Sequence, residues 1–163
     1  MADKYSLQVG NSVLEYRDTA GALRWSLPAK SVVLIAEYTT NEGPYVDDYF
    51  LVFTTVEDGT LYSSTCSFYA DGVFDTLKTL QEHLGAPIQL GLAASTEWRS
   101  RVVWPADMAD VEYFTFKDVP AKSLFDRIKA KIVGPTQEYA ISMAIREYLE
   151  RKRLAALALS PDI

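Results

Sequence analysis

Residues 47–68 contain the stretch DDYFLVFTTVEDGTLYSSTCSF, in which two apolar runs flank the turn Glu57-Asp58-Gly59-Thr60. Asp-Gly between two such runs is a strong hairpin signal, because hairpin turns of this kind need a positive φ at their central residues. The stretch therefore predicts two long antiparallel strands. The preceding segment 31–40 (SVVLIAEYTT) is rich in β-branched and aromatic residues, and it predicts a further long strand.

Toward the N-terminus, shorter segments show the same character. Residues 5–9 alternate between apolar and polar side chains, as a half-buried strand does, and residues 12–16 and 23–25 predict two more strands. Turn-forming residues separate these segments. Short strands joined by tight turns predict an antiparallel meander rather than alternating βαβ units.

Beyond residue 70 the apolar period changes from two to between three and four, which predicts a helix over about residues 72–84. Its expected core-facing stripe is Val73, Phe74, Leu77, Leu80 and Leu84. Asp71 suits the position that caps the helix, and Gly85 suits the left-handed position that ends it. We expect the stripe to pack on the sheet.

The rest of the chain predicts strand pieces at residues 88–92, 97–104 and 111–116 and then two helices. One helix begins near Pro120 and ends at Gly134-Pro135, with Leu124, Ile128 and Ile132 on one face. The other extends from a cap at Thr136 to about Leu157, with a stripe of Ile141, Ile145 and Leu149 flanked by Tyr148. The predicted organisation is a β-rich body (1–118) and a two-helix C-terminal extension (119–163).

Several short strands followed by one amphipathic helix resemble the bacterial pleckstrin-homology-like family over about residues 5–85. The resemblance is carried by the strand end Trp25-Ser26-Leu27-Pro28, the strand 49–53 and the helix stripe. It implies an α+β fold, with a bent antiparallel sheet or open barrel packed by the helix, and a binding role. The family's phosphoinositide-binding members use a basic cluster in the first hairpin. Only Lys4 and Arg17 lie near that hairpin here, so phosphoinositide binding is not expected.

Charge and composition exclude several classes of protein. The 163-residue chain has a net charge of −6. Residues 1–120 carry 8 basic and 17 acidic side chains (net −9), and residues 121–163 carry 8 and 5 (net +3). An acidic body repels phosphate backbones, so we expect no nucleic-acid partner. Cys66 and His83 are the single cysteine and histidine, which exclude an internal disulfide and any site of several histidines.

No apolar run approaches the roughly 20 residues of a membrane helix, and the start of the chain lacks the apolar segment of a secretory signal. We therefore expect a cytoplasmic protein without membrane insertion. The sequence also lacks a nucleophile-elbow motif and a glycine-rich phosphate loop. We expect no catalytic residues, no cofactor and no metal.

The first candidate binding site is an acidic loop that contains Glu42, Tyr45, Asp47 and Asp48. Such a loop is typical of a solvated or partner-facing patch. Two alternatives stay open: a Ca²⁺ or Mg²⁺ site, because these ions prefer oxygen ligands, and a carboxylate pair for acid–base chemistry. The spacing does not match an EF-hand loop.

A second candidate is a cationic strand face formed by Arg99 and Arg101. Strand alternation predicts that they point away from Trp98 and Trp104, which would pack inward. A third candidate is an oligomer contact made by the helical extension, through Ile141, Ile145, Tyr148 and Leu149.

These observations predict a non-catalytic binding module with a protein partner, most simply a second copy of itself, which would make it a homo-oligomer. One alternative is an inhibitory or immunity-type protein whose acidic loop covers a basic partner. The other is a metal-assisted hydrolase that uses the clustered carboxylates.

Overall fold

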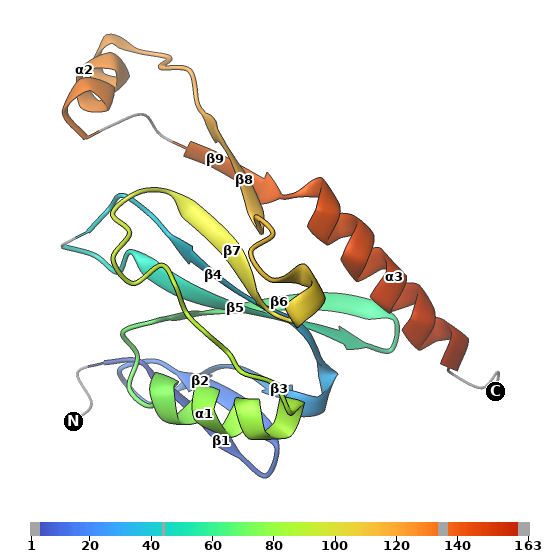
Figure 1. The fold of residues 1–163 in the computed structure, drawn as a ribbon. Coiled ribbons are helices and arrows are strands. Elements are labelled where there is room, and N and C mark those ends of the chain that lie inside the picture. The colour runs from blue at the N-terminus through green and yellow to red at the C-terminus, as the bar shows by residue number, and fades with distance from the viewer. Residues whose placement is uncertain (1–3, 44, 134–136, 160–163) are drawn as a thin grey trace.

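A four-stranded antiparallel sheet forms the middle layer of the protein (Figure 1). The computed structural model describes residues 4–43, 45–133 and 137–159. The strand order is β6-β5-β4-β7, with β4 at Val32–Thr39, β5 at Tyr49–Glu57, β6 at Thr60–Ser67 and β7 at Arg99–Trp104. β5 and β6 pair through the turn at Asp58 and Gly59, which both have a positive φ. The predicted hairpin is thus confirmed.

A three-stranded antiparallel sheet lies below the middle layer in Figure 1. It consists of β1 (Ser6–Gly10), β2 (Val13–Arg17) and β3 (Leu23–Pro28), as the meander predicts. A short turn of 3-10 helix (Ala29–Ser31) then leads into β4.

Helix α1 (Val73–Leu84) confirms the predicted helix and packs beside β1. Its buried side chains are Val73, Thr76, Leu77 and Leu80, and the Thr76 hydroxyl donates a hydrogen bond to the Leu7 carbonyl at 3.2 Å. The prediction that Phe74 belongs to the buried stripe is wrong, since 69 % of Phe74 is exposed. The helix is rotated so that Thr76 faces the sheet, and the Phe74 ring packs edge-on against Phe68.

The predicted cap at Asp71 is also wrong, because Gly72 occupies the N-cap position, with a φ of 81° and no side-chain cap. The Asp71 backbone bonds to β1 and to the residue before it: its carbonyl accepts from Leu7 N, and its N–H donates to Tyr5 O, both at 2.8 Å. A Cβ at position 72 would lie 2.4 Å from the Leu7 carbonyl oxygen, so glycine permits this close approach. Gly85 ends the helix in the left-handed conformation, as predicted.

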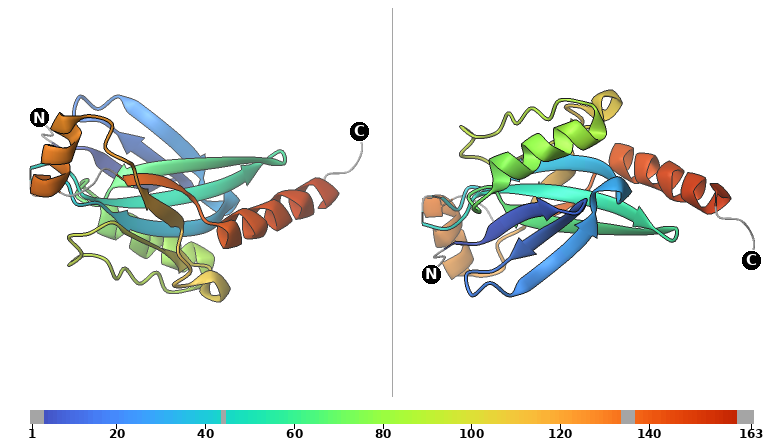
Figure 2. Two further views of the ribbon diagram at one scale, coloured as in Figure 1. Left: turned by 90° about the horizontal axis from the view of Figure 1, so that it is seen from above. Right: turned by 90° about the horizontal axis from the view of Figure 1, so that it is seen from below.

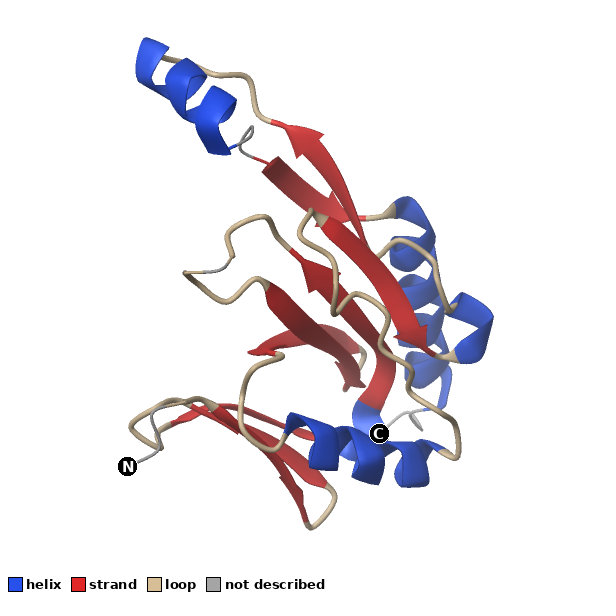
Figure 3. Cartoon of the chain, turned by 60° about the vertical axis from the view of Figure 1, so that its left-hand side comes forward, coloured by secondary structure: helices blue, strands red, loops and turns tan. Residues whose placement is uncertain are grey.

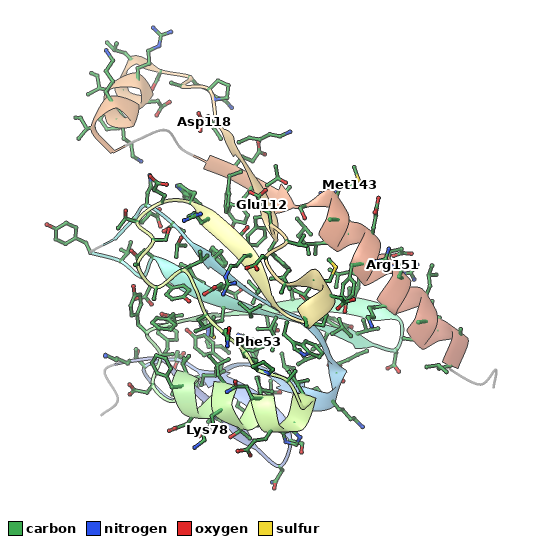
Figure 4. The ribbon with its side chains drawn as sticks, in the orientation of Figure 1. Phe53, Lys78, Glu112, Asp118, Met143 and Arg151 are labelled. Atoms are coloured by element: carbon green, nitrogen blue, oxygen red, sulfur yellow. The ribbon has the colours of Figure 1, made fainter. Side chains whose placement is uncertain are left out.

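Over β4 and β5 both faces of the middle sheet are covered, and these faces form two cores. The lower core lies between this sheet, the three-stranded sheet and α1, and it includes Leu51 and Phe53 (Figure 4). The upper core lies on the opposite face and includes Leu34, Ala36, Val52 and Val102. Successive residues of a strand point to opposite faces, so the continuous apolar run of β5 supplies both cores.

Residues 85–98 cross the molecule without helix or strand, so the strand predicted at 88–92 is wrong. Ile88 and Leu92 are buried nevertheless, and their apolar spacing reflects anchoring of a loop. The strand predicted at 97–104 is present as β7, which pairs with β4. Its register shifts near Val103, so that Val103 and Trp104 both pack on the lower core. The strict alternation predicted from Trp98 to Trp104 therefore fails at Trp104.

After β7 the chain forms an arm that stands away from the body (Figure 3). We define the arm as β8 (Phe114–Asp118), α2 (Leu124–Val133) and β9 (Gln137–Ile141); β8 and β9 pair as an antiparallel ribbon with α2 at its tip. The second predicted helix is thus confirmed as α2, and its predicted end at Gly134-Pro135 lies outside the described residues.

 The last helix, α3 (Met143–Leu159), begins later than predicted, because residues 137–141 form strand β9 rather than its first turn. Pairing of β9 with β8, which sets Tyr139 opposite Phe116, outweighs the helical period that begins at Ile141. Ser142 caps α3, because its hydroxyl accepts a hydrogen bond from Ile145 N at 3.4 Å. The cap predicted at Thr136 lies outside the described residues.

The protein is thus a mixed α+β structure with several antiparallel sheets and three α-helices, and no sheet closes into a barrel within the described residues. The predicted boundary between residues 118 and 119 falls between the paired strands β8 and β9. None of the described helices is long and apolar enough to cross a membrane.

Candidate interaction surfaces

The acidic loop lies between β4 and β5 at one end of the middle sheet (Figure 1). Glu42 and Asp47 are exposed, and Tyr45 is the most exposed of its side chains, at 95 %. Asp48 instead turns back toward the body and accepts a hydrogen bond from the Tyr69 hydroxyl at 2.6 Å. The loop therefore divides its carboxylates between solvent and a local contact.

The arrangement of these carboxylates bears on the metal site considered for the loop and on the chemistry of Tyr69. In the described part of the chain, no group of three or more His, Cys, Asp or Glu side chains is arranged to hold a metal ion, and Glu42, Asp47 and Asp48 form no such group. The hydrogen bond to Asp48 raises the pKa of Tyr69 to about 12, with burial as a smaller cause. The Tyr69 hydroxyl therefore stays protonated at neutral pH and acts as a donor.

The two arginines of the predicted cationic face have different environments. Arg99 is exposed, whereas the Arg101 side chain is 22 % exposed and forms two ion pairs. Its Nε lies 2.6 Å from Glu37 Oε1, and its Nη1 lies 2.6 Å from Asp110 Oδ1. Burial alone would lower the pKa of Arg101, but the bonds to Glu37 and Asp110 outweigh it and raise that pKa. Arg101 thus pairs with two carboxylates of the body, and neither ion pair is with the acidic loop.

Glu37 is a buried polar centre that was not among the predicted site residues. It is fully buried on β4, and its carboxylate accepts hydrogen bonds from Gly91 N at 2.7 Å and from the Tyr49 hydroxyl. Burial, and next the contact with Glu37, raise the pKa of Tyr49. The cluster ties β4, β5 and β7 to the loop 85–98. A single charged residue inside the apolar run 31–40 was the available signal, because a buried charge requires partners.

The candidate oligomer contacts lie mostly inside the protein. Ile145, Tyr148 and Leu149 are at most 5 % exposed and belong to the upper core, with Ile141 packed against it. The Tyr148 hydroxyl donates to the Val33 carbonyl at 3.1 Å. These side chains therefore fix α3 to its own sheet, and the exposed apolar residues of α3 are others: Met143, Leu154, Leu157 and Leu159.

Helix α2 carries an apolar stripe that is exposed. Leu124, Phe125, Ile128 and Ile132 are 73 %, 75 %, 50 % and 77 % exposed. Neither core includes a side chain of α2 among the residues that the structure describes. With about 3.6 residues per turn, Lys129 and Lys131 lie on the two flanks of this stripe and Asp126 lies opposite. The sequence indicated the stripe but not its exposure.

A hollow of about 350 Å³ lies where α1 begins, and we call it the acidic cleft. Its apolar lining includes Phe68, Tyr69 and Phe74, and its charged lining consists of Asp71, Asp75 and Lys4. A second hollow of about 240 Å³ shares Lys4 and Tyr69 with it and adds Tyr5 and Asp47. The acidic loop and the start of α1 thus form one surface that is aromatic and predominantly acidic.

Cys66 and His83 occupy positions with no direct link to this surface. Cys66 is 1 % exposed in the lower core, and burial raises the pKa of its thiol to about 12. The thiol is therefore protonated and enclosed at neutral pH. His83 is exposed in the last turn of α1.

Comparison of the chain with protein-family models, with curated proteins and with solved structures finds no match. The resemblance to the pleckstrin-homology-like family therefore stays a prediction.

Proposed function

We propose that this protein is a non-catalytic protein-interaction module, with the cytoplasm as its expected setting, and that its arm presents α2 to another protein. The observation that carries the proposal is the stripe Leu124, Phe125, Ile128 and Ile132, which is exposed on an element that stands clear of the body (Figure 3). Contiguous apolar side chains rimmed by polar ones are typical of interaction sites.

The length of α2 supports the same proposal. A helix of ten residues is marginal in water without tertiary packing. The α2 stripe has no place in either described core, so its own chain offers it little stabilisation. Burial against a partner would supply the packing that α1 obtains from the lower core. An amphipathic helix laid into a groove is a common mode of protein recognition.

Photo-cross-linking in cells that naturally produce the protein tests this function. A photo-reactive phenylalanine analogue replaces Phe125 in the full chain, and the same analogue replaces Lys78 in the control. Lys78 points outward from α1 on another face of the body (Figure 4). We expect a covalent protein adduct from position 125 and none from position 78. Absence of an adduct at position 125 would contradict the proposal.

A second candidate is the inhibitory or immunity-type role, in which the acidic loop covers a basic partner. The observation that favours it is the tip of the loop, where Tyr45 and Val46 are 95 % and 55 % exposed between the exposed carboxylates of Glu42 and Asp47. An aromatic anchor rimmed by charge suits fast, salt-sensitive association.

The same photo-reactive analogue at position 45 tests this candidate. We expect an adduct with a basic protein that disappears when Glu42→Lys and Asp47→Lys are combined in the same chain. An adduct that survives this charge reversal, or none at all, would count against the loop.

A further inference from the structure

The charges around α2 restrict the surface on which it can dock. Lys129 and Lys131 flank its apolar stripe, and Arg127 adds a third cation, against the single carboxylate of Asp126. A matching surface must therefore combine apolar side chains with a surplus of carboxylates. Charge complementarity of this kind steers association and disfavours wrong partners.

The acidic cleft meets this requirement on the chain itself. It offers the exposed rings of Phe74 and Tyr69 next to the carboxylates of Asp71 and Asp75, with Lys4 as its one cation. The hollow at the base of the arm has Lys117 and Arg146 in its lining against the single carboxylate of Glu138, and this surplus of cations disfavours the cationic α2. A shallow hollow at the end of α1 has no aromatic residue.

We propose that α2 of one copy docks into the acidic cleft of a second copy, and that two copies exchange their arms in this way. This inference rests on the proposed function, because it names the partner of the same helix. The geometry supports an exchange. The ribbon holds α2 away from its own body (Figure 3), and α2 lies at the same end of the molecule as the acidic loop and the start of α1 (Figures 1 and 2). A two-fold contact at that end forms both copies of the interaction at once.

Two charge-reversed chains provide the test, with sedimentation velocity as the measurement. The helix variant carries Lys129→Glu with Lys131→Glu, and the cleft variant carries Asp71→Lys with Asp75→Lys. All four residues are exposed, so both chains are expected to fold, and circular dichroism verifies this. The wild-type protein is expected to dimerise. Each variant alone is expected to dimerise at least about tenfold more weakly, since like charges then face each other.

The equimolar mixture of the two variants is the decisive sample. In a mixed pair the reversed helix meets the reversed cleft and the native helix meets the native cleft, so we expect dimers to return. Wild-type protein that stays monomeric, variants that dimerise like wild type, or a mixture that stays monomeric would each overturn the proposal.

Two further variants keep the test independent of the charge reversals. If the cleft variant fails to fold, Phe74→Ala removes an exposed ring of the cleft and should weaken dimerisation. Leu159→Ala, at the exposed end of α3, is the matched control and should leave dimerisation unchanged. Equal effects of the two substitutions would also overturn the proposal.

The two cross-linking outcomes separate this inference from the proposed function. An adduct at position 125 with a different protein, and none with a second copy, would overturn the exchange of arms and leave the interaction module intact. No adduct at all would overturn both.

Discussion

Helices α1 and α2 share an amphipathic pattern, but the apolar face of α1 is buried and that of α2 is exposed. Both carry apolar side chains spaced three or four residues apart, yet Leu77 and Leu80 on α1 are 5 % and 0 % exposed, whereas Ile128 and Ile132 on α2 are 50 % and 77 % exposed. An amphipathic pattern thus predicts that a face will be covered, but not by what. In α1 the covering surface is the chain's own sheet, and in α2 we propose that it is another protein.

The difference originates in the connections of the two helices. α1 follows a tight backbone junction in which the Asp71 carbonyl accepts from Leu7 N, and this junction places the helix against β1. α2 follows the β8–β9 ribbon, which extends its tip away from the body (Figure 3). Single substitutions in the body are therefore expected to lower the free energy of unfolding strongly, and substitutions in the arm much less.

The largest expected effect concerns the buried ion pair of the body. Arg101→Met leaves the carboxylate of Glu37 buried without its cation, which we expect to cost about 3–5 kcal/mol of unfolding free energy. Arg99→Met, two residues away at the exposed start of the same strand, is the control and should change that free energy by no more than about 0.5 kcal/mol. Urea unfolding measures both, and equal losses would contradict the assigned roles.

The next largest effect is the difference in stability loss between matched apolar-to-alanine substitutions in α1 and α2. Leu80→Ala in α1 opens a cavity in the lower core and should cost about 2–5 kcal/mol. Ile128→Ala in α2 should cost no more than about 0.5 kcal/mol at low protein concentration, because its side chain is already half-exposed. Thermal and chemical unfolding of the two variants provide the measurement. A large loss for Ile128→Ala in dilute protein would mean that α2 packs on its own chain.

The two glycines that flank α1 sharpen the account of how this helix is anchored. Gly72→Ala places a Cβ 2.4 Å from the Leu7 carbonyl oxygen, in addition to the cost of a φ of +81°. We expect a loss of about 2–3 kcal/mol. Gly85→Ala meets open space and should cost about 1 kcal/mol from its φ alone. If unfolding experiments give the same loss for both, the junction with β1 is not what holds the helix.

The smallest effect is a pH dependence at the edge of the acidic cleft. The pKa of Tyr69 is raised to about 12 in the folded protein, chiefly by its bond to Asp48, whereas in the unfolded chain it lies near 10. The folded state thus holds the proton more tightly, so this contribution is complete below about pH 10 and is lost as pH rises toward 12. Tyrosinate absorbance should show one fewer high-pH transition in Tyr69→Phe. Asp48→Asn should lower the Tyr69 pKa; an unchanged titration would contradict the bond.

The sequence predicted the elements whose local pattern and tertiary environment agree. The Asp58-Gly59 hairpin and helix α1 are such cases, because turn chemistry and apolar period point to the pairing that the structure shows. Residues 137–141 show the opposite case. Their helical period was compatible with a longer α3, but pairing with β8 decides their structure, and nothing in a single sequence reveals that partner strand.

The candidate surfaces were predictable only in part for a similar reason. Exposure of the acidic loop follows from its composition, and Glu42 and Asp47 are indeed exposed. Whether Ile145 faces its own core or a partner depends on where α3 packs. The burial of Arg101 but not of Arg99 depends on Glu37 and on the loop 85–98, which the fold brings to Arg101. The acidic cleft combines residues from the start of α1 and the end of β6 with the acidic loop beside them, and only the folded chain brings them together.

Amide hydrogen exchange of α1 and α2 at increasing protein concentration tests the central claim most directly. The account predicts that exchange in residues 124–133 is fast in dilute protein and slows as concentration rises, while exchange in residues 73–84 stays slow throughout. Slow exchange in α2 that is already present in dilute protein, or fast exchange that persists at every concentration, would contradict the claim that a second copy covers this helix.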